Sequence, residues 1–503
     1  MSSDVAASYD ALPYPAFAFW FTHPNQLAVM ATLFGLDPAR PQRCRVLEIG
    51  CAVGGNLLPM AAAAPHSRFV GVDVSGVQID LARAVADELG LDNVALVHAD
   101  LREFDPALGP FDYIIAHGVF SWVGDDVRAA LLDLCRDRLA PDGVAYVSYN
   151  ALPGWHTAGV VRDLMRLHTE PFEDPAAKVE QALAIVEWLA ERAERAGEDW
   201  RAGFLKAELD NARSLPGTTA LHEYLAPDNQ AFYLQGFLDL CNAHGLSYLS
   251  DAKPWDMWID NFGSNIAETL GPVPGIIRQA QYLDFVTHRR FRQTLLRRNI
   301  DALGRRIDTA VVEGLFVQAS IRDEPGLAGI ATGAPVKVAN PNRAPIEVAG
   351  VVPRVALHLL HRGGRRALSF QALFDAVIGE LDVLGLGAGR TETPEQRQAV
   401  RKELSRGLLR LFFGELVSFC VDPPPLALAV AERPRTGAFQ RWQARHGDAV
   451  TNLWHEHIPL GDAARAVLAR LDGSLDHAAL AALHPDPIDE TLDALLRGGL
   501  LLE

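Results

Sequence analysis

Short apolar runs alternate with amphipathic stretches through the first 150 residues of the chain. The apolar runs have the length and the branched side chains of buried strands, and the stretches between them repeat apolar residues at helical spacing. The expected strands are 46–49, 68–73, 94–98, 111–116 and 143–149, and the expected helices are 57–64, 75–90 and 127–139. Strands that alternate with helices form a parallel sheet, which binds its ligands at the carboxyl ends of the strands.

A glycine-rich turn follows the first expected strand. Gly50 to Asn56 reads Gly-Cys-Ala-Val-Gly-Gly-Asn, and Glu48 lies two positions before its first glycine. Glycine lets backbone approach a ligand closely, so the turn fits a dinucleotide fold or the nucleoside-binding turn of a methyltransferase. The dinucleotide spacing G-x-G-x-x-G is not met, because Ala52 takes the place of the middle glycine.

Polar residues end four consecutive expected strands: Glu48, Asp73, Asp100 and His117. A polar residue at one strand end is often only a solvated turn residue, but four in register predict a binding edge. Asp73 is placed to accept hydrogen bonds from both ribose hydroxyls of a nucleoside. Asp100 is placed to meet an adenine amino group. The pattern resembles that of class I S-adenosylmethionine-dependent methyltransferases.

That resemblance implies S-adenosyl-L-methionine as the cofactor. The positions that it assigns to cofactor binding are Glu48, Gly50, Cys51, Gly54, Asn56, Asp73, Val74, Asp100, Leu101, His117 and Trp122.

The pattern after residue 150 is less regular. We expect a sixth strand at 245–249 and a seventh at 314–320, interrupted by insertions over about 157–230 and 252–310. Aromatic and aliphatic residues at helical spacing over 281–296 predict a helix with a core-facing stripe. The arginines on its other face fit a substrate carboxylate or, as we favour, a solvated or salt-bridged surface. Beyond 340, short helices are expected at 346–362, 369–381, 394–414, 461–471, 476–483 and 488–498, with a strand at 415–420.

The expected fold class is therefore α/β, with a Rossmann-like sheet of seven strands, helical insertions and mainly α winged-helix-like modules at the end. We divide the chain into a cofactor-binding core with an N-terminal substrate segment (1–156), a helical regulatory insertion with the remaining core strands (157–330), and two modules (331–430 and 431–503).

The composition of this 503-residue chain disfavours some classes of binding partner. Its formal net charge of −17 disfavours nucleic acid, and no apolar stretch is long enough to suggest membrane insertion. The five cysteines form no C-x-x-C pair and the start of the chain does not resemble a secretory signal, so we expect a cytoplasmic protein with free thiols. No cluster has the spacing of metal ligands, and we expect no metal.

Several further motifs resemble a narrower family. They are Tyr9-Asp10-x-x-Pro13-Tyr14-Pro15 with Thr22-His23-Pro24, Ser148-Tyr149-Asn150-x-Leu152-Pro153-Gly154-Trp155, and His222-Glu223-Tyr224-Leu225. The chain looks like the bacterial methyltransferases that carry a methyltransferase regulatory domain. Their best-described members methylate lysine side chains of outer-membrane proteins, which implies a protein substrate here. The alternative is a small molecule or peptide in a biosynthetic pathway; a non-enzymatic role is disfavoured because the acidic strand ends are intact. A homodimer is a further possible assembly.

Methyl transfer from a sulfonium is an in-line displacement, so the site mainly has to align an uncharged acceptor. The catalytic candidates are Tyr14, His117, Tyr149 and Asn150, and the candidates for substrate binding are Tyr14, Trp122, His222 and Tyr224. His117 fits a general base, although we favour a role in capping its strand and hydrogen-bonding the methionine part of the cofactor. Tyr14 and Trp122 offer aromatic faces to a cation.

Overall fold

The computed structural model describes residues 16–105, 107–215, 217–299, 307–321, 326–340, 343–484 and 487–503. Tyr14 and the first motif around it lie outside the described residues.

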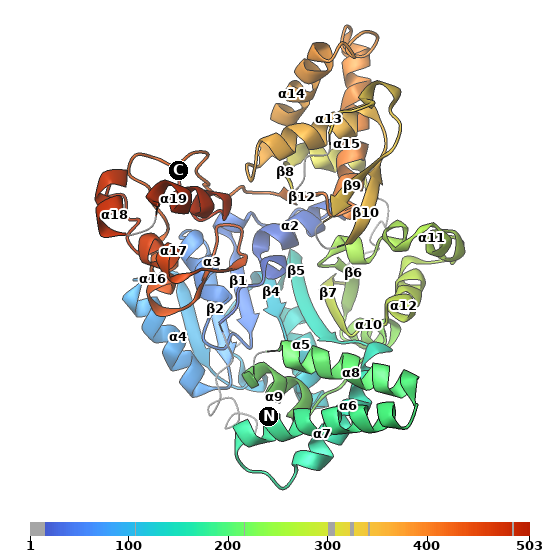
Figure 1. The fold of residues 1–503 in the computed structure, drawn as a ribbon, viewed down its shortest axis with the longest axis vertical. Coiled ribbons are helices and arrows are strands. Elements are labelled where there is room, and N and C mark those ends of the chain that lie inside the picture. Colours follow the sequence, from blue (N-terminus) through green and yellow to red (C-terminus); the bar gives the residue numbers. More distant parts are fainter. Residues whose placement is uncertain are drawn as a thin grey trace.

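A seven-stranded sheet forms the centre of the molecule (Figure 1), in the order β3-β2-β1-β4-β5-β7-β6. Its strands are β1 (Arg45–Ile49), β2 (Arg68–Asp73), β3 (Val94–His98), β4 (Phe111–Ala116), β5 (Leu139–Asn150), β6 (Leu246–Asp251) and β7 (Phe291–Arg298). The first five strands are parallel, and β7 runs antiparallel to both β5 and β6. The five strands expected from the first 150 residues, and the sixth at 245–249, are confirmed.

The sheet is buried on both faces, which explains why its central strands read as nearly continuous apolar runs. Val46 and Tyr146 pack on one face with α2 (Pro24–Leu33) and α3 (Leu57–Ala63). Leu47 and Val147 pack on the other face, which is covered by α5 (Asp125–Arg138) and α10 (Leu234–Ala243). The helix α4 (Gly76–Glu88) begins with the expected cap, since the Ser75 hydroxyl accepts a hydrogen bond from the Gln78 amide.

The expected seventh strand at 314–320 is wrong. Its residues form β8 (Phe316–Ala319), which belongs to a separate three-stranded sheet with β11 (Leu368–Ser369) and β12 (Val417–Cys420). The true seventh strand, β7, comes from the 281–296 segment that helical spacing assigned to one helix. The helix there, α12 (Ile276–Thr287), ends at His288, whose φ of 50° lies in the left-handed region that stops a helix.

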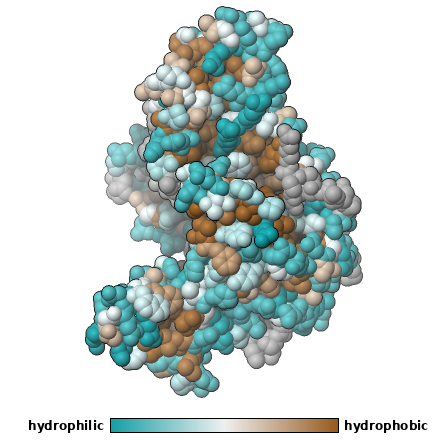
Figure 2. All heavy atoms as spheres, turned by 90° about the vertical axis from the view of Figure 1, so that its right-hand side faces the viewer, coloured by the Kyte–Doolittle hydropathy of each residue, from teal (hydrophilic) through white to brown (hydrophobic). Residues whose placement is uncertain are grey.

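The expected burial of that segment is confirmed only in part. Leu283 and Leu295 are buried, but Phe285 and Val286 are about half exposed. Arg292 forms the salt bridges that were one expectation for the arginines, yet it is fully buried and not solvated. Figure 2 turns this side of the molecule, with α11 (Ser264–Leu270) and α12, toward the viewer and shows hydrophobic side chains gathered at its middle height. The arginine is buried because carboxylates from two neighbouring elements surround it, which a helical pattern does not reveal.

A helical insertion follows β5 and has its own small core. It contains α6 (Gly154–Thr169), α7 (Pro175–Arg195), α8 (Asp199–Ser214) and α9 (Gly217–Leu225), and it lies below the sheet in Figure 1.

Two further units complete the chain. The middle module contains β8 to β12, with β9 (Val336–Asn340) and β10 (Arg343–Val348), and the helices α13 (Val351–Arg362), α14 (Phe370–Val383) and α15 (Pro394–Phe413). The C-terminal module contains α16 (Ala438–His446), a hairpin of β13 (Ala449–Thr451) and β14 (His457–Pro459), and the helices α17 (Asp462–Leu468), α18 (His477–Leu483) and α19 (Ile488–Arg497). The expected helices are confirmed, except that 346–348 belongs to β10. The domain boundaries stay predictions.

Both modules dock on the core. From the C-terminal module, Phe439 packs on Leu58 and Ala86, and the Trp442 indole N–H donates to Glu88 over 2.9 Å. From the middle module, the Val421 amide donates to the Asn25 side chain over 2.7 Å. Among the described residues, no helix is long and apolar enough to cross a membrane.

Candidate cofactor and acceptor site

The glycine-rich turn is a tight loop between β1 and α3. Gly50, Ala52 and Gly54 all have positive φ, at 71°, 48° and 76°. A Cβ at Gly50 would lie 2.6 Å from a methyl of Val119, so only glycine fits this contact. The close approach of this backbone to a ligand, which the sequence predicted, stays a prediction.

Asp73 ties this loop to the end of β2. Its two carboxylate oxygens accept hydrogen bonds from the Ala52 and Ser75 amides, each over 2.9 Å. Burial raises the pKa of Asp73, while the backbone donors oppose that shift. A carboxylate has about four acceptor positions, so Asp73 keeps capacity for two ribose hydroxyls.

Glu48 is buried beneath the loop, with a side chain that is 4% exposed. Its Oε1 accepts from the Asn56 amide over 2.7 Å, and its Oε2 has no hydrogen-bond partner in the part of the chain that the structure describes. Burial raises the pKa of Glu48 to about 8, Asn56 opposes the rise, and the charge of Asp73 adds to it. A buried acceptor without a partner is costly, so this oxygen fits a polar group of a bound ligand.

Asp100 sits at the end of β3, as expected, but it has a strong partner that the sequence reasoning missed. Arg102 donates to both of its oxygens, over 3.0 and 2.7 Å, and also reaches Asp126 over 2.6 Å. The Arg102 guanidinium holds the pKa of Asp100 well below its usual range. The spacing Asp100-x-Arg102 was the available signal. Leu101 is half-buried beside this pair, and the Val74 carbonyl pairs with the His98 ring over 3.0 Å.

His117 follows β4 and is packed among aromatic side chains. Its ring centroid is 4.1 Å from that of Phe19 and 5.8 Å from that of Phe291, and its Nδ1 hydrogen-bonds the Tyr146 hydroxyl over 2.9 Å. Burial lowers the pKa of His117 to about 3, and the charge of Lys253 adds to that effect. A group with this pKa is a weak base at neutral pH, which favours the capping role over the general-base role.

Most of this aromatic cluster could not be recognised from the sequence. Phe19, Phe21, Tyr146, Lys253 and Phe291 come from widely separated segments, and the Lys253 ammonium lies 4.6 Å from the centre of the Phe21 ring. The run Phe17-Ala18-Phe19-Trp20-Phe21 was the one local signal, since so dense a group of aromatic residues is uncommon.

Asn150 ends β5 beside this cluster. Its side-chain amide donates to Asn229 over 2.9 Å, and its backbone N–H donates to the Ser121 hydroxyl over 2.8 Å. Tyr149 points to the opposite face of the strand, where its ring stacks on Phe237 with centroids 3.9 Å apart. The structure therefore does not bring the Tyr149 side chain together with His117, because side chains alternate along a strand.

The remaining substrate candidates lie on two other elements, and Tyr224 packs in the core of the helical insertion. Trp122 is half-buried and packs edge-on against Trp155, with ring centroids 6.3 Å apart. His222 and Tyr224 are buried on α9. Burial raises the pKa of Tyr224 to about 12, and that of its neighbour Glu223 to about 7.

Arg290 connects α8 to the end of β5. Its guanidinium pairs with Glu208, and its carbonyl accepts from the Ala151 amide over 2.7 Å. Among the described residues, no group of three or more side chains of the kinds that bind metals lies together.

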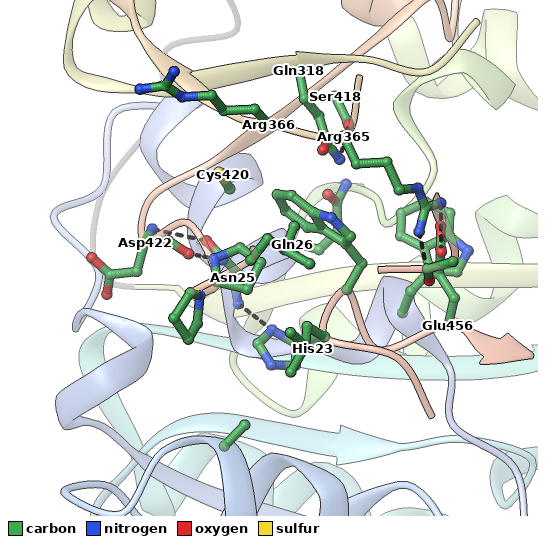
Figure 3. Close-up of a pocket in the computed structure, with 18 of the residues that line it drawn as sticks. His23, Asn25, Gln26, Gln318, Arg365, Arg366, Ser418, Cys420, Asp422 and Glu456 are labelled. Carbon is green, nitrogen blue, oxygen red and sulfur yellow. Dashed lines mark hydrogen bonds and ion pairs between the residues drawn. The ribbon is translucent and has the colours of Figure 1, made fainter. Parts of the chain in front are cut away.

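A separate cleft of about 1180 Å³ lies between α2, the middle module and the C-terminal module (Figure 3). Asn25 and Asp422 face each other on one side of it, and Arg365 pairs with Glu456 over 2.8 Å on another. His23 lines the cleft, and its Nδ1 accepts from the Asn25 amide over 3.1 Å.

Models of three families match this chain. A methyltransferase domain matches residues 46–143, a predicted methyltransferase regulatory domain matches 219–298, and the C-terminal winged helix domain of PKMT matches 432–486. The chain is 30% identical over 479 residues to the uncharacterised protein RP789 of Rickettsia prowazekii, covering 94% of this chain and 84% of that protein.

Solved structures extend the similarity to nearly the whole chain. The structure of PKMT2 from Rickettsia typhi in complex with AdoHcy matches with a TM-score of 0.82 and 26% identity. The match covers 98% of this chain and 100% of that one. A second structure of PKMT2 matches with the same TM-score and 25% identity.

Proposed function

We propose that this chain, which belongs to the family of S-adenosylmethionine-dependent methyltransferases with a methyltransferase regulatory domain, methylates lysine side chains of a protein. The chain is a methyltransferase, and its cofactor is S-adenosyl-L-methionine. The observation that carries the lysine proposal is the match to PKMT2 along nearly the whole chain, with the regulatory and winged-helix domains included.

The cofactor loop has groups that fit this ligand. Glu48 Oε2 is a buried acceptor with no partner in the described chain, and Asp73 keeps free acceptor positions toward ribose hydroxyls. Gly50 lets backbone come close to the ligand. When bound, the cofactor supplies a methyl group on a positively charged sulfur.

The acceptor pocket supports an amine that arrives uncharged. Aromatic side chains surround His117, and burial in such surroundings lowers the pKa of an ammonium group. The positive charge of Lys253 lies beside the same rings and lowers that pKa further. A lysine that enters the pocket therefore loses its proton readily to water, without a strong base in the enzyme.

Asn150 and Asn229 orient the acceptor in this proposal. Their side-chain amides already pair over 2.9 Å, and each keeps hydrogen-bonding groups for a substrate. Because burial lowers its pKa to about 3, His117 is neutral at neutral pH and takes no proton there. Its role in this proposal is to support the packing of the aromatic side chains around it. Homodimerisation, a cytoplasmic location and the lack of a nucleic-acid partner stay predictions.

A labelling experiment tests the acceptor class. The protein is incubated with methyl-labelled cofactor and an extract of its own cells, and the products are separated by size. We expect label in high-mass material that yields methyl-lysine after hydrolysis, and much less of it with an Asp73→Ala variant. Label that stays in low-mass material would overturn the lysine proposal in favour of a small molecule or peptide.

A further inference from the structure

A side chain of the C-terminal module reaches the cofactor loop. His455 lies at the tip of the β13–β14 hairpin, and its Nε2 is 2.8 Å from Oδ1 of Asn56. The two side chains are 4% and 5% exposed, and 399 residues separate them in the chain. The contact therefore joins the last module directly to the turn that follows β1.

Asn56 is the centre of a hydrogen-bond network. Its Oδ1 also accepts from the Phe19 amide over 2.9 Å, and its Nδ2 donates to Glu48 over 2.7 Å and to the Thr22 hydroxyl over 3.0 Å. A backbone N–H can only donate, so Oδ1 must face Phe19, and the His455 nitrogen must then be the donor. The same orientation directs Nδ2 toward Glu48.

The hairpin holds His455 in an unfavourable backbone conformation. Its φ of 61° lies in the left-handed region, where glycine is preferred. The Asn452 side chain fixes the turn by accepting from the Trp454 and Glu456 amides, both over 2.9 Å. Strain of this kind persists where the surrounding structure requires it. The turn itself does not require histidine, so we take the hydrogen bond from its side chain to Asn56 as the reason for this residue.

We propose that His455 is a positioning residue for the cofactor site: through Asn56 it sets the place of Glu48, so that cofactor affinity depends on the docked C-terminal module. His455 acts through two other side chains and touches no reacting atom. The inference rests on the assignment of the cofactor and not on lysine as the acceptor. Failure of the lysine proposal would therefore leave it intact.

A contact that serves only to attach the module predicts a different result. Phe439 and Trp442 already attach this module to α3 and α4, so the module stays docked without His455. An attachment role would change the stability of docking and leave the affinity for cofactor unchanged.

Calorimetric titration with S-adenosylhomocysteine separates the two roles in the full-length chain. His455→Phe keeps the volume of the ring and removes the donor, and we expect it to weaken binding by roughly tenfold. His455→Gln keeps a donor and should recover most of that loss. Trp442→Phe removes a docking hydrogen bond far from the loop and should bind like the parent. Unchanged affinity in His455→Phe, or an equal loss in Trp442→Phe, overturns the proposal.

A second measurement uses the parent chain, in case His455→Phe does not fold. Coupling between two sites is reciprocal, so a ligand that depends on the module must also stabilise its docking. Limited proteolysis in the segment 421–437 should slow at least fivefold with saturating S-adenosylhomocysteine. A cleavage rate that the ligand does not change would contradict the coupling.

Discussion

The two halves of the central sheet differ in the groups at their strand ends. We call β1 to β3 the cofactor half and β4 to β7 the acceptor half. In the cofactor half, Glu48, Asp73 and Asp100 end β1, β2 and β3, and all three lie within about fifty residues of the chain. In the half that we propose for the acceptor, neutral aromatic and amide groups lie near the strand ends, and Phe19, Asn150 and Phe291 come from distant segments.

The charges in the two halves differ as well. The cofactor half buries carboxylates that backbone and amide N–H groups satisfy only in part, which leaves room for a ligand. The acceptor half buries a complete ion cluster inside the sheet, where Arg292 meets Asp251 and Asp284, each over 2.8 Å. We infer that the cofactor half is built to be completed by a ligand, whereas the acceptor half is complete as a scaffold and leaves selectivity to the loops around it.

The largest expected effect tests the scaffold. Arg292→Met leaves two buried carboxylates without their cation and should lower the free energy of unfolding by about 3–5 kcal/mol. Arg195→Met breaks an exposed pair with Glu191 and should cost less than about 0.5 kcal/mol. Denaturant unfolding of both variants measures the difference. Equal losses would show that the buried cluster does not anchor the acceptor half.

The next effect tests the cofactor half. Asp73→Ala removes the acceptor for two loop amides and, as proposed, for the ribose, and should cost about 3 kcal/mol of cofactor binding, roughly a hundredfold in Kd. Asp80→Ala, on the exposed side of α4, should bind like the parent. Calorimetry with S-adenosylhomocysteine measures both. Parent-like affinity in Asp73→Ala would remove Asp73 from the site.

The pH dependence of cofactor affinity tests whether Glu48 contacts the ligand. The pKa of Glu48 is about 8 in the folded chain and near 4.5 when unfolded, so its contribution to stability is present below about pH 4.5 and is lost as the pH rises through about 8. A cationic cofactor favours the carboxylate, so binding near pH 7 should release close to one proton. Affinity should then rise by up to about 1.4 kcal/mol per pH unit below pH 8.

Calorimetric titrations in buffers of different ionisation enthalpy measure how many protons are released on binding. Glu48→Gln cannot release it, and its affinity should vary far less with pH. Proton release that survives in Glu48→Gln would assign the titration to another group.

The smallest expected effect separates acceptor handling from cofactor binding. Asn150→Ala removes the amide that pairs with Asn229 and should lower kcat by about tenfold, the equivalent of one hydrogen bond, with the Kd for cofactor unchanged. Rates of label transfer measure kcat, and calorimetry measures the Kd for cofactor. A parallel loss of cofactor affinity would place Asn150 in the cofactor half instead.

The same comparison explains what the sequence could predict. The parallel strands and their acidic ends follow from patterns within ten residues. The glycine turn alone left two ligands open, and the cofactor follows from the resemblance that Glu48, Asp73 and Asp100 carry together. The fold class, the cofactor and the enzyme class are accordingly confirmed, while the individual site residues stay predictions that the variants above address.

Long-range pairing was beyond the reach of local patterns. β7 was hidden because Arg292 looks solvated until Asp251 and Asp284 are brought beside it, and an antiparallel strand after a helix carries no spacing signal of its own. β8 was assigned to the wrong sheet because its partner β12 begins about a hundred residues later. Tyr149 and Asn150 are adjacent in the chain, yet the alternation of the strand sends their side chains to opposite faces.

The Asn25 contact with the middle module has a consequence for the order in which contacts can form during synthesis. Asn25 at the start of α2 accepts from the backbone of Val421, 396 residues later, and the segment just before α2 supplies Phe19 to the aromatic cluster around His117. The ribosome releases the sheet long before it releases residue 421. The residues of all seven strands therefore leave the ribosome before the hydrogen bond between Asn25 and Val421 can form.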